Sequence, residues 1–295
     1  MEICPRRRRR WRVGWDIKND VANLSAQYKA MFGFTDEDIV KHQQAWSTRI
    51  HPEDLASVTL TLQNYWEGKT DKYVHEHRII CKDKSVKWVL SRGKLIKRDK
   101  TGRPLRMVGT HTDITEHKLL ENQLENLAHF DGLTGLPNRT LFDDRLKLAL
   151  AYAKREKKKL ATMFIDLDLF KEINDLYGHE VGDLVLKQVS QRLIACVRES
   201  DTVARLGGDE FVILLPMIDD TNDATLVATK IVEAIRQPIM VNSTSLHVTS
   251  SIGISIYPQH GVDEKILMLN ADMAMYQAKR DGKNQAKVFD AKMHT

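Results

Sequence analysis

The stretch TVARLGGDEFVILL, residues 202–215, decides the fold of the C-terminal half of the chain. A strand-like segment, 202–206, and an apolar run, 211–215, flank Gly207 and Gly208 and the acids Asp209 and Glu210. Strand-like runs on either side of a glycine-containing turn are typical of a β-hairpin. We therefore predict a hairpin with two acids in its turn and with residues 211–215 in the core.

A second apolar run, 160–165, leads directly into Asp166 and Asp168. If this strand lies beside the hairpin, its carboxylates converge with Asp209 and Glu210. Carboxylate oxygens from two strands suit Mg²⁺, which takes one or two carboxylates together with substrate phosphates. Such a site supports phosphoryl or nucleotidyl transfer.

The alternative is that Gly-Gly-Asp is only turn sequence and that Asp166 caps a helix. The paired glycines weigh against it, because bare backbone also lets a phosphate approach closely.

Further from the hairpin, helical and strand patterns alternate. We predict helices over 141–154, 169–177, 180–197, 224–236 and 264–279, and strands over 160–165, 202–206, 211–215, 246–257 and 286–289. Gly178 separates the second and third helices. This order predicts an α+β layer in which helices back an antiparallel sheet.

The N-terminal half has a mixed, mostly β pattern. We predict a strand over 15–17, short helices over 28–34 and 36–40, a helix over 52–66, and strands over 73–81, 86–97 and 104–112. Residues Asp99 to Gly102 form a good hairpin turn between the last two strands. One sheet with helices packed on it is expected.

These patterns divide the chain into a basic tail (1–10), a first domain (11–115), a linker helix (116–130) and a second domain (131–291). Thr115 suits the N-cap of the linker helix. Leu120, Leu124 and Leu127 have the spacing of a short parallel coiled coil between two subunits, and a plain surface helix is the alternative.

Composition limits the class of protein. The 295 residues are 42% hydrophobic and 29% charged, which is typical of ordered soluble domains. No apolar run is long enough for a membrane span and residues 1–10 lack the apolar core of a secretory signal, so a cytoplasmic protein is expected. Three widely spaced cysteines fit neither a disulfide framework nor a metal site.

Much of the net charge of +5 lies in the run Arg6 to Arg10. Such a run can bind nucleic acid or an anionic membrane. Because no interleaved aromatic residues accompany it, we predict a solvated tail and no nucleic-acid partner.

The C-terminal half resembles the GGDEF family of diguanylate cyclases. The similarity rests on 205–211 (RLGGDEF), on 131–139 (DGLTGLPNR), on 164–168 (FIDLD) with Phe170, Lys171 and Asn174, on Gly178-His179 with Gly182-Asp183, and on 276–279 (YQAK) with 282–284 (GKN). The order and spacing of these motifs agree with the family from Asp131 to about Phe289.

The resemblance implies roles for individual residues. Asp166 and Asp209, with the Leu167 carbonyl, would hold Mg²⁺, with Mn²⁺ as an alternative, and Glu210 would assist a second metal or the attacking hydroxyl. The remaining residues are implied to bind GTP: Asn174 and Asp183 at the guanine edge, Gly207 and Gly208 near the phosphates, and Lys171, Lys279 and Lys283 as counter-charges. His179 is implied either to touch substrate or to serve a structural role.

A further motif, Arg198-Glu199-Ser200-Asp201, matches the inhibitory product site of that family in sequence and in its spacing from Gly207. Arginine can form paired hydrogen bonds with a phosphate or a guanine edge, so this site would bind cyclic di-GMP. A solvated ion pair between Arg198 and Asp201 is the alternative.

The N-terminal half resembles a PAS domain with its C-terminal PAC segment. The similarity rests on Trp15-Asp16, on 51–54 (HPED), on Trp88 with the following hairpin, and on Asp113-Ile114-Thr115. No flavin-adduct motif is present, and His51, His75 and His77 are expected to be surface or core histidines rather than haem ligands. The PAS ligand stays unknown.

Together the resemblances imply a PAS-controlled homodimer that condenses two GTP into cyclic di-GMP and two pyrophosphates. A non-catalytic cyclic di-GMP receptor predicts a degraded signature, whereas this signature is intact. A cyclase that makes another dinucleotide predicts a different residue at position 183, whereas this chain has aspartate there. No EAL motif follows, so degradation of cyclic di-GMP is not expected.

Overall fold

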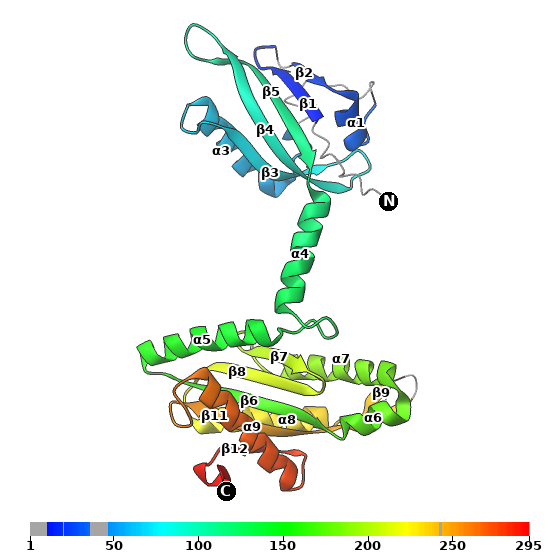
Figure 1. Ribbon diagram of the computed structural model, residues 1–295, viewed down its shortest axis with the longest axis vertical. Helices are drawn as coiled ribbons and strands as arrows, with labels where there is room; N and C mark the ends of the chain where they lie inside the picture. Colours follow the sequence, from blue (N-terminus) through cyan, green and yellow to red (C-terminus); the bar gives the residue numbers. More distant parts are fainter. Residues whose placement is uncertain (1–10, 20, 36–46, 242–243, 295) are drawn as a thin grey trace, which may run out of the picture. The chain divides into compact units, whose positions relative to one another are not determined.

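The computed structural model describes residues 11–19, 21–35, 47–241 and 244–294. The chain forms two compact units, residues 1–123 and 124–295, and the division falls within helix α4 (Thr115–His129). Figure 1 shows the elements of each unit. Among the described helices, none is both long enough and apolar enough to cross a membrane.

The first unit is built on an antiparallel sheet whose described strands have the order β2-β1-β5-β4-β3. These strands are β1 (Trp11–Asp16), β2 (Val21–Leu24), β3 (Tyr73–Ile80), β4 (Val86–Arg98) and β5 (Pro104–Asp113). Helices α1 (Ala26–Met31) and α3 (Pro52–Trp66) accompany the sheet. The predicted helix over 36–40 lies outside the described residues, and the four-residue strand β2 was not predicted.

Hydrogen bonds close the turn between β4 and β5. Gly102 N donates to Asp99 O at 3.1 Å, and the Asp99 carboxylate accepts from Thr101 N and Arg103 N, which closes the predicted turn.

His77 is fully buried on β3, and burial together with nearby His75 lowers its pKa to about 4. His77 is thus a neutral core histidine near pH 7.

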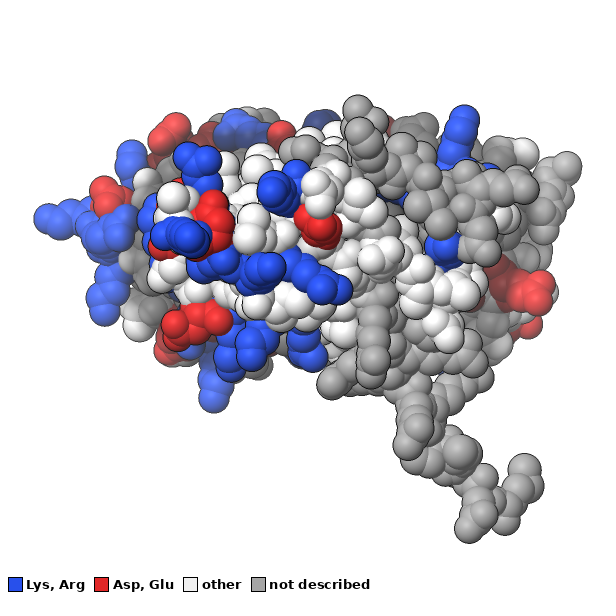
Figure 2. Space-filling model, turned by 90° about the horizontal axis from the view of Figure 1, so that it is seen from above, with Lys and Arg blue, Asp and Glu red and all other residues white. Residues whose placement is uncertain are grey.

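Basic side chains gather on the β4–β5 hairpin. Lys and Arg crowd the face shown in Figure 2, and Lys94, Lys97, Arg98, Lys100, Arg103 and Arg106 are all exposed. Asp99 is the only acid between Lys94 and Arg106. The positive charge of the chain is therefore not confined to the arginine run.

The second unit has a mixed sheet of order β12-β11-β6-β8-β7. Its strands are β6 (Lys159–Asp168), β7 (Thr202–Gly207), β8 (Glu210–Ile218), β11 (Thr249–Tyr257) and β12 (Gln285–Val288). The prediction of an antiparallel sheet holds for β11-β6-β8-β7 but is wrong for β12, which pairs parallel with β11. Helix α9 (Glu264–Arg280) lies between β11 and β12 in the chain, and a helical crossover is the usual way to join parallel strands.

The predicted strand over 246–257 is interrupted. Its first residue belongs to β10 (Thr244–Leu246), which pairs with β9 (Ile239–Val241) in a separate ribbon. Pairing with β6 begins only at Thr249. The predicted strand is therefore divided between two sheets, because residues 244–246 pair with β9 and residues 249–257 pair with β6.

Helices cover both faces of this sheet, because side chains alternate along its strands. One core joins β6, β8 and β11 to α6 (Phe170–Tyr177), α7 (His179–Cys196) and α8 (Thr221–Ile235). The other joins β6, β7 and β8 to α5 (Arg139–Glu156) and α9. A short 3₁₀ helix, η2 (Ala291–His294), follows β12. The predicted α+β class is confirmed.

Candidate active site

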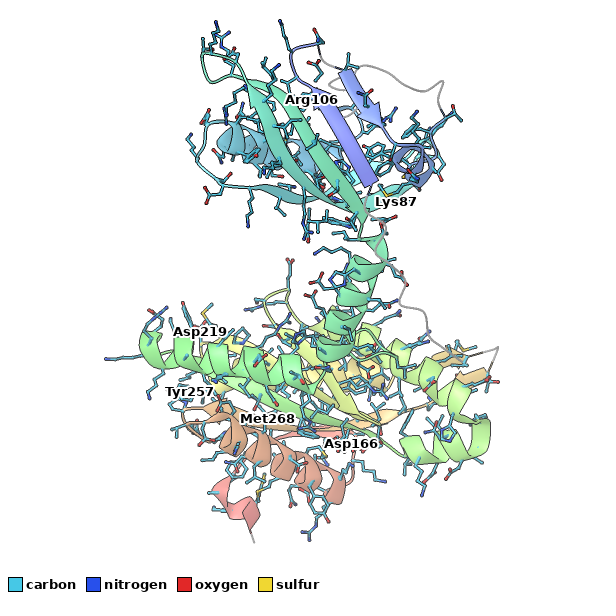
Figure 3. The ribbon with its side chains drawn as sticks, turned by 45° about the horizontal axis from the view of Figure 1, so that its top comes forward. Lys87, Arg106, Asp166, Asp219, Tyr257 and Met268 are labelled. Carbon is cyan, nitrogen blue, oxygen red and sulfur yellow. The ribbon has the colours of Figure 1, made fainter. Side chains whose placement is uncertain are left out.

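Strand β6 ends in two carboxylates on the face that α5 and α9 cover. Phe164 belongs to the core on that face, and alternation places Asp166 and Asp168 on the same side. Leu167 points into the opposite core and is 1% exposed. Figure 3 shows Asp166 at this end of the sheet.

Asp166 and Glu210 are direct cross-strand partners in the β6–β8 pairing. Burial raises the pKa of Asp166; the hydrogen bond from Lys279 opposes this and the Asp209 carboxylate adds to it. Burial also raises the pKa of Glu210, and Asp166, Asp209 and Asp272 raise it further. The predicted convergence of acids from the strand and the hairpin is therefore present, and it forms a site of concentrated negative charge.

Lys279 supplies positive charge to this site from α9. Its Nζ lies 2.7 Å from Asp166 Oδ1. The partner carboxylate is mostly buried, so this ion pair is poorly screened by water. A lysine that can reach Asp166 can also reach a phosphate held there.

Asp168 lies near enough for its charge to raise the pKa of Asp166, but its own carboxylate is engaged by other groups. Its carboxylate accepts hydrogen bonds from Thr249 Oγ1 at 2.7 Å, Ser251 Oγ at 2.7 Å and Asn284 N at 3.1 Å. Asn284 and its neighbour Lys283 have left-handed backbone, with φ of 47° and 63°. Asp168 thus anchors the turn that carries Lys283.

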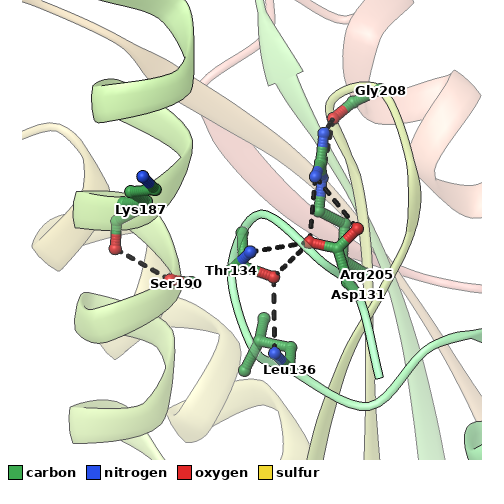
Figure 4. A network of polar contacts seen from close by, with 7 residues as sticks. All are labelled: Asp131, Thr134, Leu136, Lys187, Ser190, Arg205 and Gly208. Carbon is green, nitrogen blue, oxygen red and sulfur yellow. Dashed lines mark hydrogen bonds and ion pairs between the residues drawn. The ribbon is translucent and has the colours of Figure 1, made fainter. Parts of the chain in front are cut away.

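The glycine turn is held by Arg205, as Figure 4 shows. Arg205 Nε and Nη2 donate to Gly208 O at 3.0 and 2.7 Å, while Nη1 donates to both oxygens of Asp131 at 3.0 and 3.1 Å. Asp131 also accepts from Thr134 N and Thr134 Oγ1. Gly207 and Gly208 have φ of 146° and 52°, a conformation that other residues rarely adopt.

Arg205 and Asp131 lie within the GGDEF-like motifs, but the sequence alone indicates no role for either residue. An arginine directly before two glycines was an available signal, because its fork can bind a turn carbonyl and a carboxylate together. Their distance in sequence concealed the pairing.

A second group of predicted residues meets at the corner between α6 and α7. Gly178, with φ of 84°, ends α6 and begins α7, and its N donates to Asn174 O at 2.9 Å. Asn174 is half-buried against the first turn of α7, whereas His179 and Asp183 are exposed on the first two turns of that helix. Lys171 is exposed on the first turn of α6.

Arg198 and Asp201 lie at the far end of β7 from the glycine turn. Asp201 Oδ2 accepts from the backbone N of Arg198 at 2.8 Å. No ion pair between the Arg198 side chain and Asp201 is found in the part of the chain that the structure describes. Both residues line a hollow of about 600 Å³ that also includes Lys158, Asp219, Asp223 and Lys230.

The acidic side chains of this site would coordinate a divalent cation only together with oxygen atoms of the substrate and water. Within residues 11–19, 21–35, 47–241 and 244–294, no group of three His, Cys, Asp or Glu side chains is placed to hold a metal ion. Two carboxylates completed by phosphate oxygens and water are the usual donors for Mg²⁺ at nucleotide sites. The closely placed acids with raised pKa values agree with that donor set.

Comparison with known proteins connects this geometry to a family. The family model "Diguanylate cyclase, GGDEF domain" matches residues 128–285, and a PAS fold model matches residues 21–111. The bifunctional diguanylate cyclase/cyclic di-GMP phosphodiesterase MucR of Pseudomonas aeruginosa is 47% identical over 172 residues, which are 58% of this chain and 25% of MucR. Diguanylate cyclase TpbB of the same species is 45% identical over 168 residues, 57% of this chain and 39% of TpbB.

Solved structures of GGDEF domains are similar to the second unit of this chain. The GGDEF domain of P. aeruginosa TpbB has a TM-score of 0.55 at 42% identity and covers 56% of this chain and 97% of its own. The coiled coil and GGDEF domain of DgcB from Caulobacter crescentus, in complex with c-di-GMP, has a TM-score of 0.54 at 29% identity and covers 59% of this chain and 93% of its own. The chain spans only a quarter to two fifths of the length of MucR and TpbB. It belongs to the GGDEF-domain family of diguanylate cyclases, with a PAS-fold domain preceding the GGDEF domain.

Proposed function

We propose that this chain is a diguanylate cyclase that condenses two GTP into cyclic di-GMP and two pyrophosphates. One observation carries the proposal: Asp166 and Glu210 face each other across β6 and β8, beside Lys279 and the turn that bears Asp209. An acid pair next to the Lys279 ammonium group and a glycine turn is suited to nucleotidyl transfer.

Mg²⁺, or Mn²⁺ as an alternative, would be held by Asp166 and Asp209 with the Leu167 carbonyl, and Glu210 would assist a second ion or the attacking hydroxyl. A bound divalent ion would neutralise phosphate charge and help to activate the hydroxyl nucleophile. Because burial and like charges disfavour ionised Asp166 and Glu210, a cation would relieve an existing electrostatic cost.

The remaining residues bind and orient GTP. Asp183 accepts from the N1–H and N2–H₂ groups that guanine has and adenine lacks, while Asn174 donates to and accepts from the purine edge. Lys171, Lys279 and Lys283 neutralise the phosphates, and His179 lies at the start of α7 beside this site. The bare backbone of Gly207 and Gly208 leaves room for a phosphate to approach.

The reaction requires two GTP-loaded domains. The 3′-oxygen of one ribose forms a bond to the α-phosphorus of the other nucleotide, the bond from that phosphorus to pyrophosphate breaks, and Glu210 accepts the hydroxyl proton. Repetition in the opposite direction closes the ring. Since one domain holds one nucleotide, the active species is a homodimer in which proximity lowers the barrier.

Regulation would act on the dimer and on the product site. The PAS domain and α4 would set the geometry of the two GGDEF domains in response to an unknown signal. Arg198 and Asp201 would bind accumulated cyclic di-GMP and slow the enzyme. The exposed Arg198 side chain and the hollow beside it support this assignment.

The proposal is tested by incubating the purified chain with GTP and Mg²⁺ and identifying the product by mass. We expect Asp209→Ala to lower turnover at least about 100-fold. Asp209 lies in a turn, so stability should change by no more than about 0.5 kcal/mol. Asp144→Ala, which removes an exposed carboxylate on α5, is the matched control and should retain wild-type turnover. Formation of cyclic di-GMP by the Asp209 variant at the wild-type rate would refute the metal assignment.

A further inference from the structure

Gly182 lies so close to a neighbouring side chain that a Cβ atom would not fit. A Cβ atom at this position would overlap with Asn174 Oδ1, and it would lie 3.0 Å from Asn174 Cγ and 3.2 Å from Phe170 Cζ. The backbone of Gly182 is not in the left-handed region. Space, rather than backbone conformation, therefore excludes a side chain here.

The other glycines near the site differ in this respect. Gly178, Gly207 and Gly208 have positive φ, and a Cβ at any of them would meet nothing within 4 Å. Glycine is favoured at those three positions because of the backbone conformation and not because space is lacking. Gly182 instead leaves a space that the Asn174 amide fills.

The surroundings fix this space. Gly182 lies in the first turns of α7, and its N donates to Gly178 O at 3.2 Å. Phe170 and Ile173 of α6 are buried in the core that α6 shares with α7. The two helices are thereby packed together next to the Asn174–Gly182 contact.

We infer that Gly182 is a positioning residue for nucleotide recognition, acting through Asn174. This inference rests on the proposed function, in which Asn174 and the adjacent Asp183 bind the guanine edge. The missing side chain lets the Asn174 amide lie directly on the α7 backbone, one residue from Asp183. Two residues from different helices thus form one hydrogen-bonding edge.

An alanine at Gly182 would displace the end of Asn174. To restore ordinary contact, Oδ1 must retreat by more than about 1 Å. The obstructing atom is the end of a flexible side chain, so rotation of Asn174 relieves the overlap while the helix pair stays packed. The fold should survive, and the hydrogen bonds to the purine should not.

The test is calorimetric titration of the full chain with 3′-deoxy-GTP and Mg²⁺, since this analogue lacks the attacking hydroxyl and binds without reacting. We expect Gly182→Ala to weaken binding at least about tenfold, as loss of one well-formed hydrogen bond does. The thermal midpoint should stay at the wild-type value. Gly132→Ala is the matched control, because a Cβ there meets nothing within 4 Å and its φ is not left-handed.

A double-mutant cycle separates positioning from a structural effect. With Asn174→Ala in place there is no amide to displace, so adding Gly182→Ala should change affinity by less than about twofold. Wild-type affinity of Gly182→Ala overturns the inference, as does a tenfold loss that persists in the Asn174→Ala background. If the wild-type chain binds no 3′-deoxy-GTP at all, the proposed function itself fails.

Discussion

Arg205 shows how much one side chain controls at the candidate active site. Its guanidinium makes hydrogen bonds to Gly208 O on one side and to Asp131 on the other. Gly208 directly precedes Asp209, so this contact limits where the Asp209 carboxylate can lie. The Arg205 side chain is only 10% exposed, and its charge-assisted bonds to Asp131 are partly buried.

We predict that Arg205→Lys lowers turnover about 10- to 100-fold, because an ammonium cannot reproduce the fork and a small misplacement at a reacting centre is costly. Binding of 3′-deoxy-GTP should change less than turnover. Steady-state kinetics and calorimetry on the same preparation provide the check.

Arg145→Lys is the control for that substitution. Arg145 Nη1 makes one side-chain hydrogen bond, to Thr202 Oγ1 at 3.1 Å, which a lysine can replace. Equal losses of turnover in the two variants would show that the geometry of the Arg205 fork is unimportant.

At the scale of elements, the HPED segment fastens α3 to β3. Asp54, in the first turn of α3, accepts from Arg78 N at 2.8 Å, Arg78 Nε at 3.0 Å and Arg78 Nη2 at 2.6 Å. His51 N donates to Arg78 O at 2.9 Å. The segment that carries part of the PAS resemblance is therefore a clamp between a helix and the sheet.

The Asp54 clamp predicts a pH-dependent stability. The hydrogen bonds from Arg78 lower the pKa of Asp54 from 3.8 to about 2. Because the folded pKa is depressed, the stabilisation is fully present above the ordinary pKa and is lost as the pH falls through about 2. We expect Asp54→Asn to destabilise the first unit at pH 7 by about 2 kcal/mol, the range for hydrogen bonds to charged groups.

Tryptophan fluorescence measures this effect in the full chain. All five tryptophans lie at or before Trp88, so their emission reports unfolding of the first unit. The difference between wild type and Asp54→Asn should shrink between about pH 4 and pH 2. A difference that stays constant across that range would contradict the clamp.

Strand β7 separates the predicted product site from the glycine turn that carries Asp209. Its six residues span about 20 Å. Arg198→Ala should therefore keep the initial rate with GTP while weakening cyclic di-GMP binding by roughly 1.5 to 3 kcal/mol. Progress curves of the variant should continue past the product level at which wild type slows.

Glu199→Ala is the control for that variant, since Glu199 is an exposed neighbour outside the motif pair. Titration with cyclic di-GMP and full progress curves should be run on all three proteins. If the Arg198 variant slows at the same product level as wild type, the product site lies elsewhere.

At the scale of the whole molecule, α4 carries an unusual number of exposed leucines. Leu119, Leu120, Leu124 and Leu127 are 52–72% exposed, and no residue of this helix is buried. Such a stripe gains stability when it packs against another helix. A parallel pairing with a second copy of α4 would bring two chains together, as the proposed reaction requires.

We predict that Leu124→Glu weakens the dimer, because a buried carboxylate without a partner is unfavourable at a helix interface. Specific activity should fall at low enzyme concentration and recover as concentration rises. Asn122→Glu adds the same charge outside the leucine positions and should have little effect. Light scattering of both variants measures the association directly, and an unchanged dimer in Leu124→Glu would argue against pairing through α4.

The sequence by itself predicted most of the helices and strands and the acids of the candidate site. Apolar periods located helix 52–66 and the hairpins, because one-sided burial leaves a regular pattern in the chain. Paired acids after a buried strand and in a glycine turn pointed to a phosphate site, and the resemblance to the GGDEF family supplied the roles of the individual residues. The parallel pairing of β12 was missed, because strand direction depends on the crossover of α9 rather than on the residues of β12.

Only the tertiary structure decided which residues act together. It showed that Asp168 accepts hydrogen bonds from Thr249, Ser251 and Asn284, whereas Asp166 faces Glu210. It also paired Arg205 with Asp131 across 74 positions and placed Asn174 on Gly182. The physical reason is that hydrogen bonds and steric exclusion depend on distances of a few ångströms in space, which a local sequence pattern does not encode.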